Sequence, residues 1–187
     1  MKYPKLSNEY FKLVTFLCEV YPEKMKDLPQ QLFENFMSSI QMAISNFGTD
    51  IAKCSLDALS SLSKYFFTEC DKTHPSSQQL NQALLQFLNI VFQFMVLENF
   101  PVDLIEPASE SLFLLICCHQ EEYLKLANNL ISQQHVTDEN FKQKLIGAFE
   151  VLTPPGLQLT PNRLSLKQFR KNIEIFLQDV KGFLCIK

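Results

Sequence analysis

Two segments of this chain share a residue pattern that strongly constrains the fold. They are Ile51–Leu62 and Ile105–Ile116, which begin 54 residues apart and each follow another strongly apolar segment. In both, apolar residues recur at helical spacing, with small residues near the start and bulky ones after them. A helix pair that recurs along a chain predicts an all-α solenoid of stacked hairpins. Because a solenoid works by offering a surface, we expect partner binding rather than a catalytic pocket.

The remaining sequence predicts about eight helices and no convincing strand, because helical periods dominate and short β-branched alternations are missing. Pro22 is expected to end the first helix, since an internal proline loses a hydrogen bond and clashes with the preceding turn. Gly48 is a natural stop for the second helix, and Thr49 is a candidate cap for the third. The expected helices cover about 7–21, 29–47, 51–66, 77–97, 102–118, 120–134, 137–152 and 165–182.

The segment 153–164, TPPGLQLTPNRL, holds three prolines and one glycine and is predicted to be a linker. We therefore expect helical repeats over 1–152, the Pro-rich linker, and a C-terminal capping helix with an apolar tail over 165–187, in one continuous array. Phe183 and Leu184 of the tail are expected to fold back onto the last hairpin. The first helix has an apolar stripe with no preceding partner, so we interpret the chain as a fragment from the end of a longer array.

Charge and hydropathy disfavour two classes of function. The net charge is −3, from 17 Lys+Arg against 20 Asp+Glu, and the basic residues are scattered. A nucleic-acid-binding protein normally concentrates basic residues on one face, so no nucleic-acid partner is expected. The longest apolar run is Leu112–Cys118, whereas a membrane span needs about 20 residues, so no membrane insertion is expected. The 17 phenylalanines are expected to pack between helix layers.

The residues that carry chemistry form no recognisable catalytic, cofactor or metal site. The six cysteines contain no Cys-x-x-Cys and most lie in apolar stripes, which favours reduced structural thiols in a cytosolic or nuclear protein over a disulfide framework. Cys70 and His74 have a zinc-like spacing but no second pair. Cys117, Cys118 and His119 suggest a nucleophile, but sequence adjacency does not supply the orientation that catalysis needs. We therefore expect no enzyme and no cofactor.

Several segments together resemble the HEAT repeats of the importin-β superfamily of nuclear transport receptors (karyopherins). The resemblance covers nearly the whole chain and is sharpest at its two ends. The segments, in order, are EYFKLVTFLCEVYPEK at 9–24, then Leu28-Pro29 and Leu32-Phe33, His119-Gln120, Glu122-Tyr123, 132–134, and GFLCIK at 182–187. These are not catalytic motifs, and the specificity of the resemblance rests on their joint order.

The resemblance implies a HEAT-type helical-hairpin solenoid from the C-terminal part of an exportin. Such a receptor binds protein cargo together with Ran-GTP and shuttles between nucleus and cytoplasm. The chain departs from the family in size, because Ran-GTP binding in this family depends heavily on N-terminal repeats that this chain lacks. On its own, the piece is expected at most to contact cargo or Ran. The alternative is a generic helical-repeat scaffold or adaptor without a link to Ran.

Charged residues on the exposed sides of the third and fifth helices are the candidate partner surface. Such charges can set partner choice and the rate of association. The alternative is that they are ordinary solvated residues. The candidate residues are Lys53, Asp57, Lys64, Glu106 and Glu110.

Overall fold

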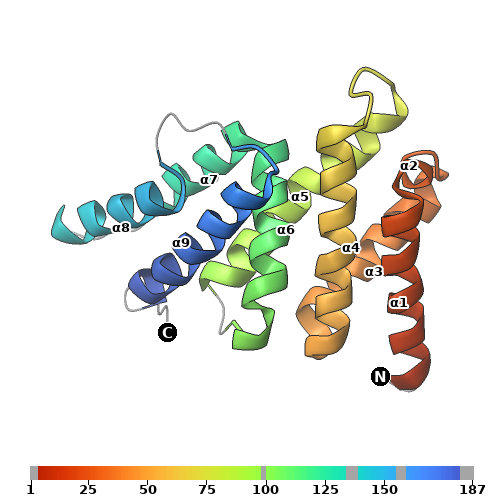
Figure 1. Cartoon of the computed structure of the whole chain (residues 1–187), viewed down its shortest axis with the longest axis horizontal. Helices are drawn as coiled ribbons and strands as arrows, with labels where there is room; N and C mark the ends of the chain where they lie inside the picture. The colour runs from red at the N-terminus through yellow and green to blue at the C-terminus, as the bar shows by residue number, and fades with distance from the viewer. Residues whose placement is uncertain (1–3, 98–99, 134–138, 155–158, 182–187) are drawn as a thin grey trace.

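The computed structural model describes residues 4–97, 100–133, 139–154 and 159–181, and every regular element in these ranges is a helix (Figure 1). The predicted all-α class is therefore confirmed. The elements are α1 Pro4–Val20, α2 Pro22–Met25, α3 Gln30–Asn46, α4 Thr49–Thr68, α5 Ser76–Leu97, the 3₁₀ helix η1 Val102–Leu104, α6 Ile105–Cys118, α7 Gln120–Gln133, α8 Glu139–Leu152 and α9 Arg163–Lys181.

Proline and glycine set two of the helix boundaries, as predicted. The helix α1 ends at Val20, and Pro22 begins the short helix α2, where a missing N–H costs nothing. Gly48 follows the end of α3 with a φ of 33°, a backbone region that glycine reaches without steric penalty. The sequence did not predict α2, because four residues are too few to show a helical period.

The expected cap of the third helix was wrong. Gly48, not Thr49, holds the N-cap position of α4, and no side chain caps this helix end. Thr49 lies inside the first turn, so its hydroxyl is displaced by one residue from the position from which a cap reaches the free N–H groups. The positive φ of Gly48 explains why glycine stands at this position. Glycine adopts this backbone conformation without steric penalty, so the chain can leave α3 and enter α4 at one residue.

The helices stack in two layers, and each hairpin packs against the next. In Figure 1 the helices α1, α4, α6 and α9 lie side by side, each in contact with the one before it. Behind them α3 packs on α4 and α5 on α6, and α8 packs on α9. The helix α5 also contacts α3 and α7, which extends the second layer. This neighbour-to-neighbour packing agrees with the predicted helical solenoid.

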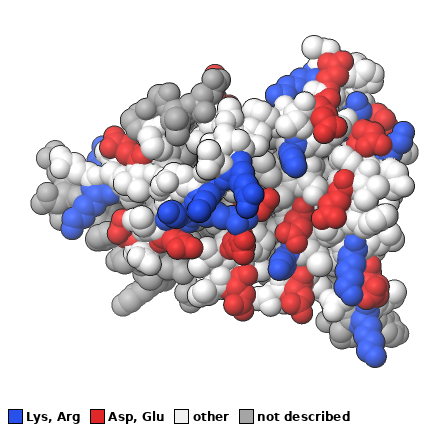
Figure 2. Space-filling model, viewed as in Figure 1, with Lys and Arg blue, Asp and Glu red and all other residues white. Residues whose placement is uncertain are grey.

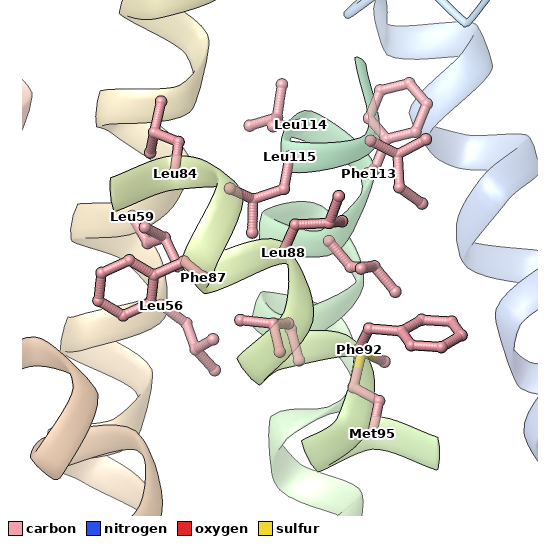
Figure 3. Packing of buried hydrophobic residues seen from close by; sticks show 14 of the residues in the cluster. Leu56, Leu59, Leu84, Phe87, Leu88, Phe92, Met95, Phe113, Leu114 and Leu115 are labelled. Atoms are coloured by element: carbon pink, nitrogen blue, oxygen red, sulfur yellow. The ribbon is translucent and has the colours of Figure 1, made fainter. Parts of the chain in front are cut away.

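The core lies between the layers and centres on α5. The side chains of Leu84 and Leu88 on this helix are fully buried, as is Leu59 on α4 (Figure 3). The helix α5 is apolar on nearly every side because it contacts α3, α4, α6, α7 and α9. Burial of its large side chains joins the neighbouring hairpins into one hydrophobic cluster.

Phenylalanine rings connect the C-terminal hairpins, in agreement with the predicted Phe-rich packing between layers. Phe92 on α5 contacts Phe149 on α8, with ring centroids 6.0 Å apart. Phe149 in turn contacts Phe176 on α9 at 4.9 Å. Phe113 on α6 packs against Phe169 on α9 at 5.3 Å. Large rings therefore fill the space between α6 and α9. This agrees with the repeated pattern of Ile105–Ile116, in which bulky residues follow the small ones.

Small residues, by contrast, mark the contact between α4 and α6. Cys118 Sγ on α6 donates a hydrogen bond to the Ser63 carbonyl oxygen on α4 at 3.3 Å. Ser111 lies seven residues before Cys118, on the same side of α6, and is fully buried. Ser60 lies one turn before Ser63 on α4 and is also buried. Short side chains at these positions let the two helix backbones approach closely.

The predicted division into repeats, linker and capping segment stays a prediction. The helix α8 ends at Leu152 and α9 begins at Arg163. Leu159, which lies between them, is buried and its carbonyl oxygen accepts a hydrogen bond from Gln120 Nε2 at 2.9 Å. The expected folding back of Phe183 and Leu184 concerns residues outside the described ranges.

Candidate partner-binding surface

The outer side of the layer formed by α1, α4, α6 and α9 carries many of the charged side chains seen in Figure 2. The structure brings the five predicted residues onto this side. Lys53 and Lys64 project from α4 and are exposed, and Asp57 lies between them on the same face and is half-buried. Glu106, exposed, and Glu110, half-buried, belong to the adjacent helix α6. Whether a partner uses these residues stays a prediction.

The half-buried carboxylate of Asp57 on this surface has a raised pKa. Burial raises its pKa, Lys53 opposes that change, and the nearby carboxylates of Glu110, Glu19 and Glu106 raise it further. Glu19 belongs to α1 and the other two glutamates belong to α6, so two neighbouring helices contribute acidic groups around one half-buried carboxylate on α4. The negative potential there is suited to a cationic side chain from a partner, because such a charge would relieve the repulsion.

Arg170 on α9 binds both glutamates of α6. Its Nη1 donates to Glu106 Oε1 at 2.7 Å and its Nη2 donates to Glu110 Oε2 at 2.6 Å. The two glutamates lie four residues apart and therefore project from one side of α6, which is the geometry that a planar guanidinium needs to bind both. Two of the five predicted surface residues thus have a partner inside the molecule and hold α9 beside α6.

The role of Arg170 does not follow from the sequence alone. The spacing of Glu106 and Glu110 indicates a shared face, but it does not say which of 17 Lys and Arg residues lies opposite. The pairing joins residues 64 and 60 positions apart in the chain. Only the packing of α9 on α6 brings them together.

The thiols that suggested nucleophilic chemistry are protonated at neutral pH, and the neighbouring imidazole favours its neutral form. Burial raises the pKa of the Cys117 and Cys118 thiols to about 12, so the nucleophilic thiolate is scarce at neutral pH. The His119 ring stacks on Phe66 with centroids 6.2 Å apart. Burial, and secondarily the charge of Lys72, lowers the pKa of His119, which therefore favours its neutral form.

The zinc-like spacing of Cys70 and His74 does not form a shared site. Cys70 Sγ donates to Ser77 Oγ at 3.3 Å, whereas His74 Nδ1 pairs with Ser76 Oγ at 2.7 Å. Among the described residues, no three His, Cys, Asp or Glu side chains are grouped so that they could hold a metal ion. The cysteines at 18, 54, 70, 117 and 118 are free thiols. In the same ranges, no helix has the length and hydropathy to cross a bilayer.

A second surface lies on the other layer, in a groove of about 440 Å³ between α3 and α5. Its buried apolar lining residues are Phe33, Met37, Ala83 and Phe87. Gln79, another lining residue, donates hydrogen bonds to the carbonyl oxygens of Lys26 and Leu28. Five other glutamines line this groove, at positions 30, 41, 78, 82 and 86. No pattern in the sequence indicates this groove, because its two walls lie about 50 residues apart in the chain.

Comparison with known proteins identifies the family. The family model described as Exportin-4 matches residues 1–187, the whole chain. The chain belongs to the exportin-4 family. The resemblance inferred from the ordered segments is thereby confirmed at the level of a single family. Exportin-4 of Dictyostelium discoideum is 29% identical to this chain over 184 residues. That alignment covers 97% of the chain and 15% of the Dictyostelium protein, so the chain spans less than a sixth of that relative's length.

Proposed function

We propose that this chain is the C-terminal part of an exportin, a nuclear transport receptor that carries protein cargo out of the nucleus in a Ran-GTP-dependent complex. The observation that carries the proposal is the match of the Exportin-4 family model to all 187 residues. In this function the receptor shuttles between nucleus and cytoplasm and acts by binding, without catalysis, cofactor, nucleic acid or membrane insertion. Since the chain matches 15% of its Dictyostelium relative, transport belongs to the longer receptor.

The charged side of α1, α4, α6 and α9 is the surface that this segment contributes. Lys53 and Lys64 are exposed cations on α4, and the charge of Lys53 acts on the half-buried carboxylate of Asp57. Exposed charges of both signs steer association and select partners, while they add little to affinity individually. We assign partner contact to this α4 face, whereas Glu106 and Glu110 also serve the fold through Arg170.

The test uses the full-length receptor that contains this segment, incubated with cargo from a nuclear extract. Cargo capture is compared with Ran locked in its GTP state, Ran in its GDP state, and no Ran. The expected result is capture that Ran-GTP increases at least about tenfold, a coupling free energy of about 1.4 kcal/mol. Equal capture in the three conditions would contradict the transport function and favour the alternative, a helical-repeat scaffold without a link to Ran.

A pair of variants then tests the surface itself. Lys53→Glu together with Lys64→Glu reverses the exposed cations of α4, and Lys125→Glu on α7 is the control. We expect the α4 variant to slow complex formation at low salt, with a smaller effect at high salt, because such charges act mainly on the association rate. An association rate equal to that of the control variant would show that these lysines are only solvated.

A further inference from the structure

A row of unpaired cations follows one side of α9. Arg163, Lys167 and Lys171 are spaced four residues apart, so they project from one side of the helix, and all three are exposed. Figure 2 shows Lys and Arg side chains gathered where Figure 1 places α9. Among the described residues none of the three has an ion-pair partner, whereas Arg170 on the same helix binds two glutamates of α6. We call Arg163, Lys167 and Lys171 the α9 row.

The charges of the α9 row are unfavourable for its helix. Like charges four residues apart on a helix repel one another and destabilise it. Arg163 also lies in the first turn of α9, where the helix dipole favours negative charge. The first carboxylate along this helix is that of Glu174, which is exposed and forms no ion pair in the part of the chain that the structure describes. Acidic groups from a partner would therefore relieve a repulsion that the described residues leave unbalanced.

An apolar pocket of about 530 Å³ lies beside the α9 row. Lys167 and Lys171 belong to its lining, so two cations stand next to its apolar part. The apolar lining comes from the end of α8, from the segment before α9 and from α9 itself: Leu152, Pro154, Leu159, Leu164 and Phe169. The side chain of Leu164 is 80% exposed, so an apolar side chain that enters the pocket would also cover it.

Hydrogen bonds hold the walls of this pocket in place. Asn172 Nδ2 on α9 donates to the Val151 carbonyl oxygen on α8 at 2.7 Å. Gln120 Nε2 on α7 donates to the Leu159 carbonyl oxygen at 2.9 Å. Asn162 Oδ1 accepts a hydrogen bond from a backbone N–H in the first turn of α9 at 2.8 Å, which caps this helix. Because the walls are already fixed, binding there would cost little ordering of the protein.

The α9 row and the pocket lie side by side along one helix, and this arrangement suits an extended peptide. Four residues of an α-helix rise about 6 Å, close to the roughly 6.6 Å that two residues span in an extended chain. Successive side chains of an extended chain point to opposite sides. Acidic side chains at alternate positions would therefore reach the α9 row, while an apolar side chain between two of them would reach the pocket.

We propose that the α9 row and its pocket bind an extended acidic segment of a partner protein, in which an apolar side chain stands between two carboxylates. Charge complementarity and the apolar pocket together select this occupant. A nucleic acid is disfavoured because the chain carries a net charge of −3 and the row offers three cations, few for a polyphosphate. The proposal goes beyond the transport function and rests on this chain's own residues, so loss of Ran dependence in the capture experiment would leave it standing.

Fluorescence anisotropy of the 187-residue chain with a labelled peptide tests the proposal. The probe is Ser-Glu-Ser-Glu-Leu-Glu-Ser, and two control peptides replace either the three glutamates by glutamine or the leucine by serine. The glutamine peptide should bind at least about tenfold more weakly than the probe, and the serine peptide at least about fivefold more weakly. Equal binding of the three peptides, or no binding of the probe at about 1 mM, would overturn the proposal.

Variants of the chain locate the binding site. Lys167→Glu with Lys171→Glu should weaken binding of the probe at least about tenfold, and Leu164→Ser at least about threefold. These positions are exposed, so the melting temperature should stay within about 2 °C. The control, Lys24→Glu with Lys142→Glu, changes the net charge equally at exposed positions on α2 and α8 and should leave binding unchanged. Equal weakening by the control and the row variant would show attraction to net charge alone and would overturn the proposal.

A single-stranded oligonucleotide tests the other class of partner. Labelled oligo-dT of about 12 nucleotides should bind at least about tenfold more weakly than the acidic probe. Oligonucleotide binding as tight as that of the probe, and lost in the Lys167→Glu and Lys171→Glu variant, would assign the row to a nucleic acid and overturn the proposal.

Discussion

Leu59 offers the sharpest test of the stacked arrangement. It is 0% exposed on α4 and lies where α4 meets α5 and α6 (Figure 3). Replacement by alanine removes three carbon groups, which costs about 2.4 kcal/mol of transfer free energy at roughly 0.8 kcal/mol each. The cavity left behind adds to this, because neighbouring hairpins in contact on both sides relax only partly. We therefore expect Leu59→Ala to lower the free energy of unfolding by about 2–5 kcal/mol.

The assay is urea unfolding followed by circular dichroism, with Lys64→Ala as the control on the same helix. Lys64 is exposed, and its removal should change the free energy of unfolding by less than about 0.5 kcal/mol. A thermal melt should show a decrease of about 4–20 °C for Leu59→Ala, from the usual 2–4 °C per kcal/mol for a domain of this size. If both variants unfold at the same urea concentration, the apolar face of α4 is not where the core is.

The remaining predictions concern the ion pair and the buried thiols. Arg170→Ala should lower the free energy of unfolding by about 1 kcal/mol in low salt and by less in about 1 M NaCl. The effect is small and depends on salt because Arg170 and Glu110 are 33% and 40% exposed, so solvent screens their charges. A loss of stability no larger than that of Lys171→Ala would refute a stabilising role of the ion pair. The pKa of Cys18 and Cys117 is raised to about 12, so alkylation of these thiols at pH 8, followed by peptide mass spectrometry, should be at least about 100-fold slower in the folded chain than in urea. The same shift holds the protonated thiol in the fold, so stability is full below about pH 9 and falls as pH rises toward 12; an unfolding midpoint that rises over this range would contradict the assignment.

Local patterns were enough to predict the helices and much of the core. The stripe that includes Ile51, Ala58 and Leu62 is buried on α4, because a helical period in the sequence becomes one face in space. The predicted helix boundaries agree with the structure where a single residue determines them, as at Pro22. They failed at α2, which is too short to have a period, and at Thr49, where a glycine conformation outweighed the side-chain cap.

The candidate surface was predictable only in part. Charges on one side of a helix follow from spacing, and Lys53, Asp57 and Lys64 do share a face of α4. The Arg170 pairing and the glutamine groove each depend on helices that are distant in the chain, and helical periods carry no information about such neighbours. The pKa changes depend in the same way on burial, which exists only once the hairpins are stacked.

The small residues between α4 and α6 have a mechanical consequence. Where Ser63 and Cys118 meet, a short thiol of α6 reaches the backbone of α4 directly, so we expect these two helices to have little room to slide or tilt. Between α6 and α9, rotatable rings and an exposed ion pair fill the contact instead. We therefore expect the array to flex between α6 and α9 and to stay rigid between α4 and α6. A partner bound across all three helices would contact a rigid surface at α4 and α6 and a more flexible one at α9.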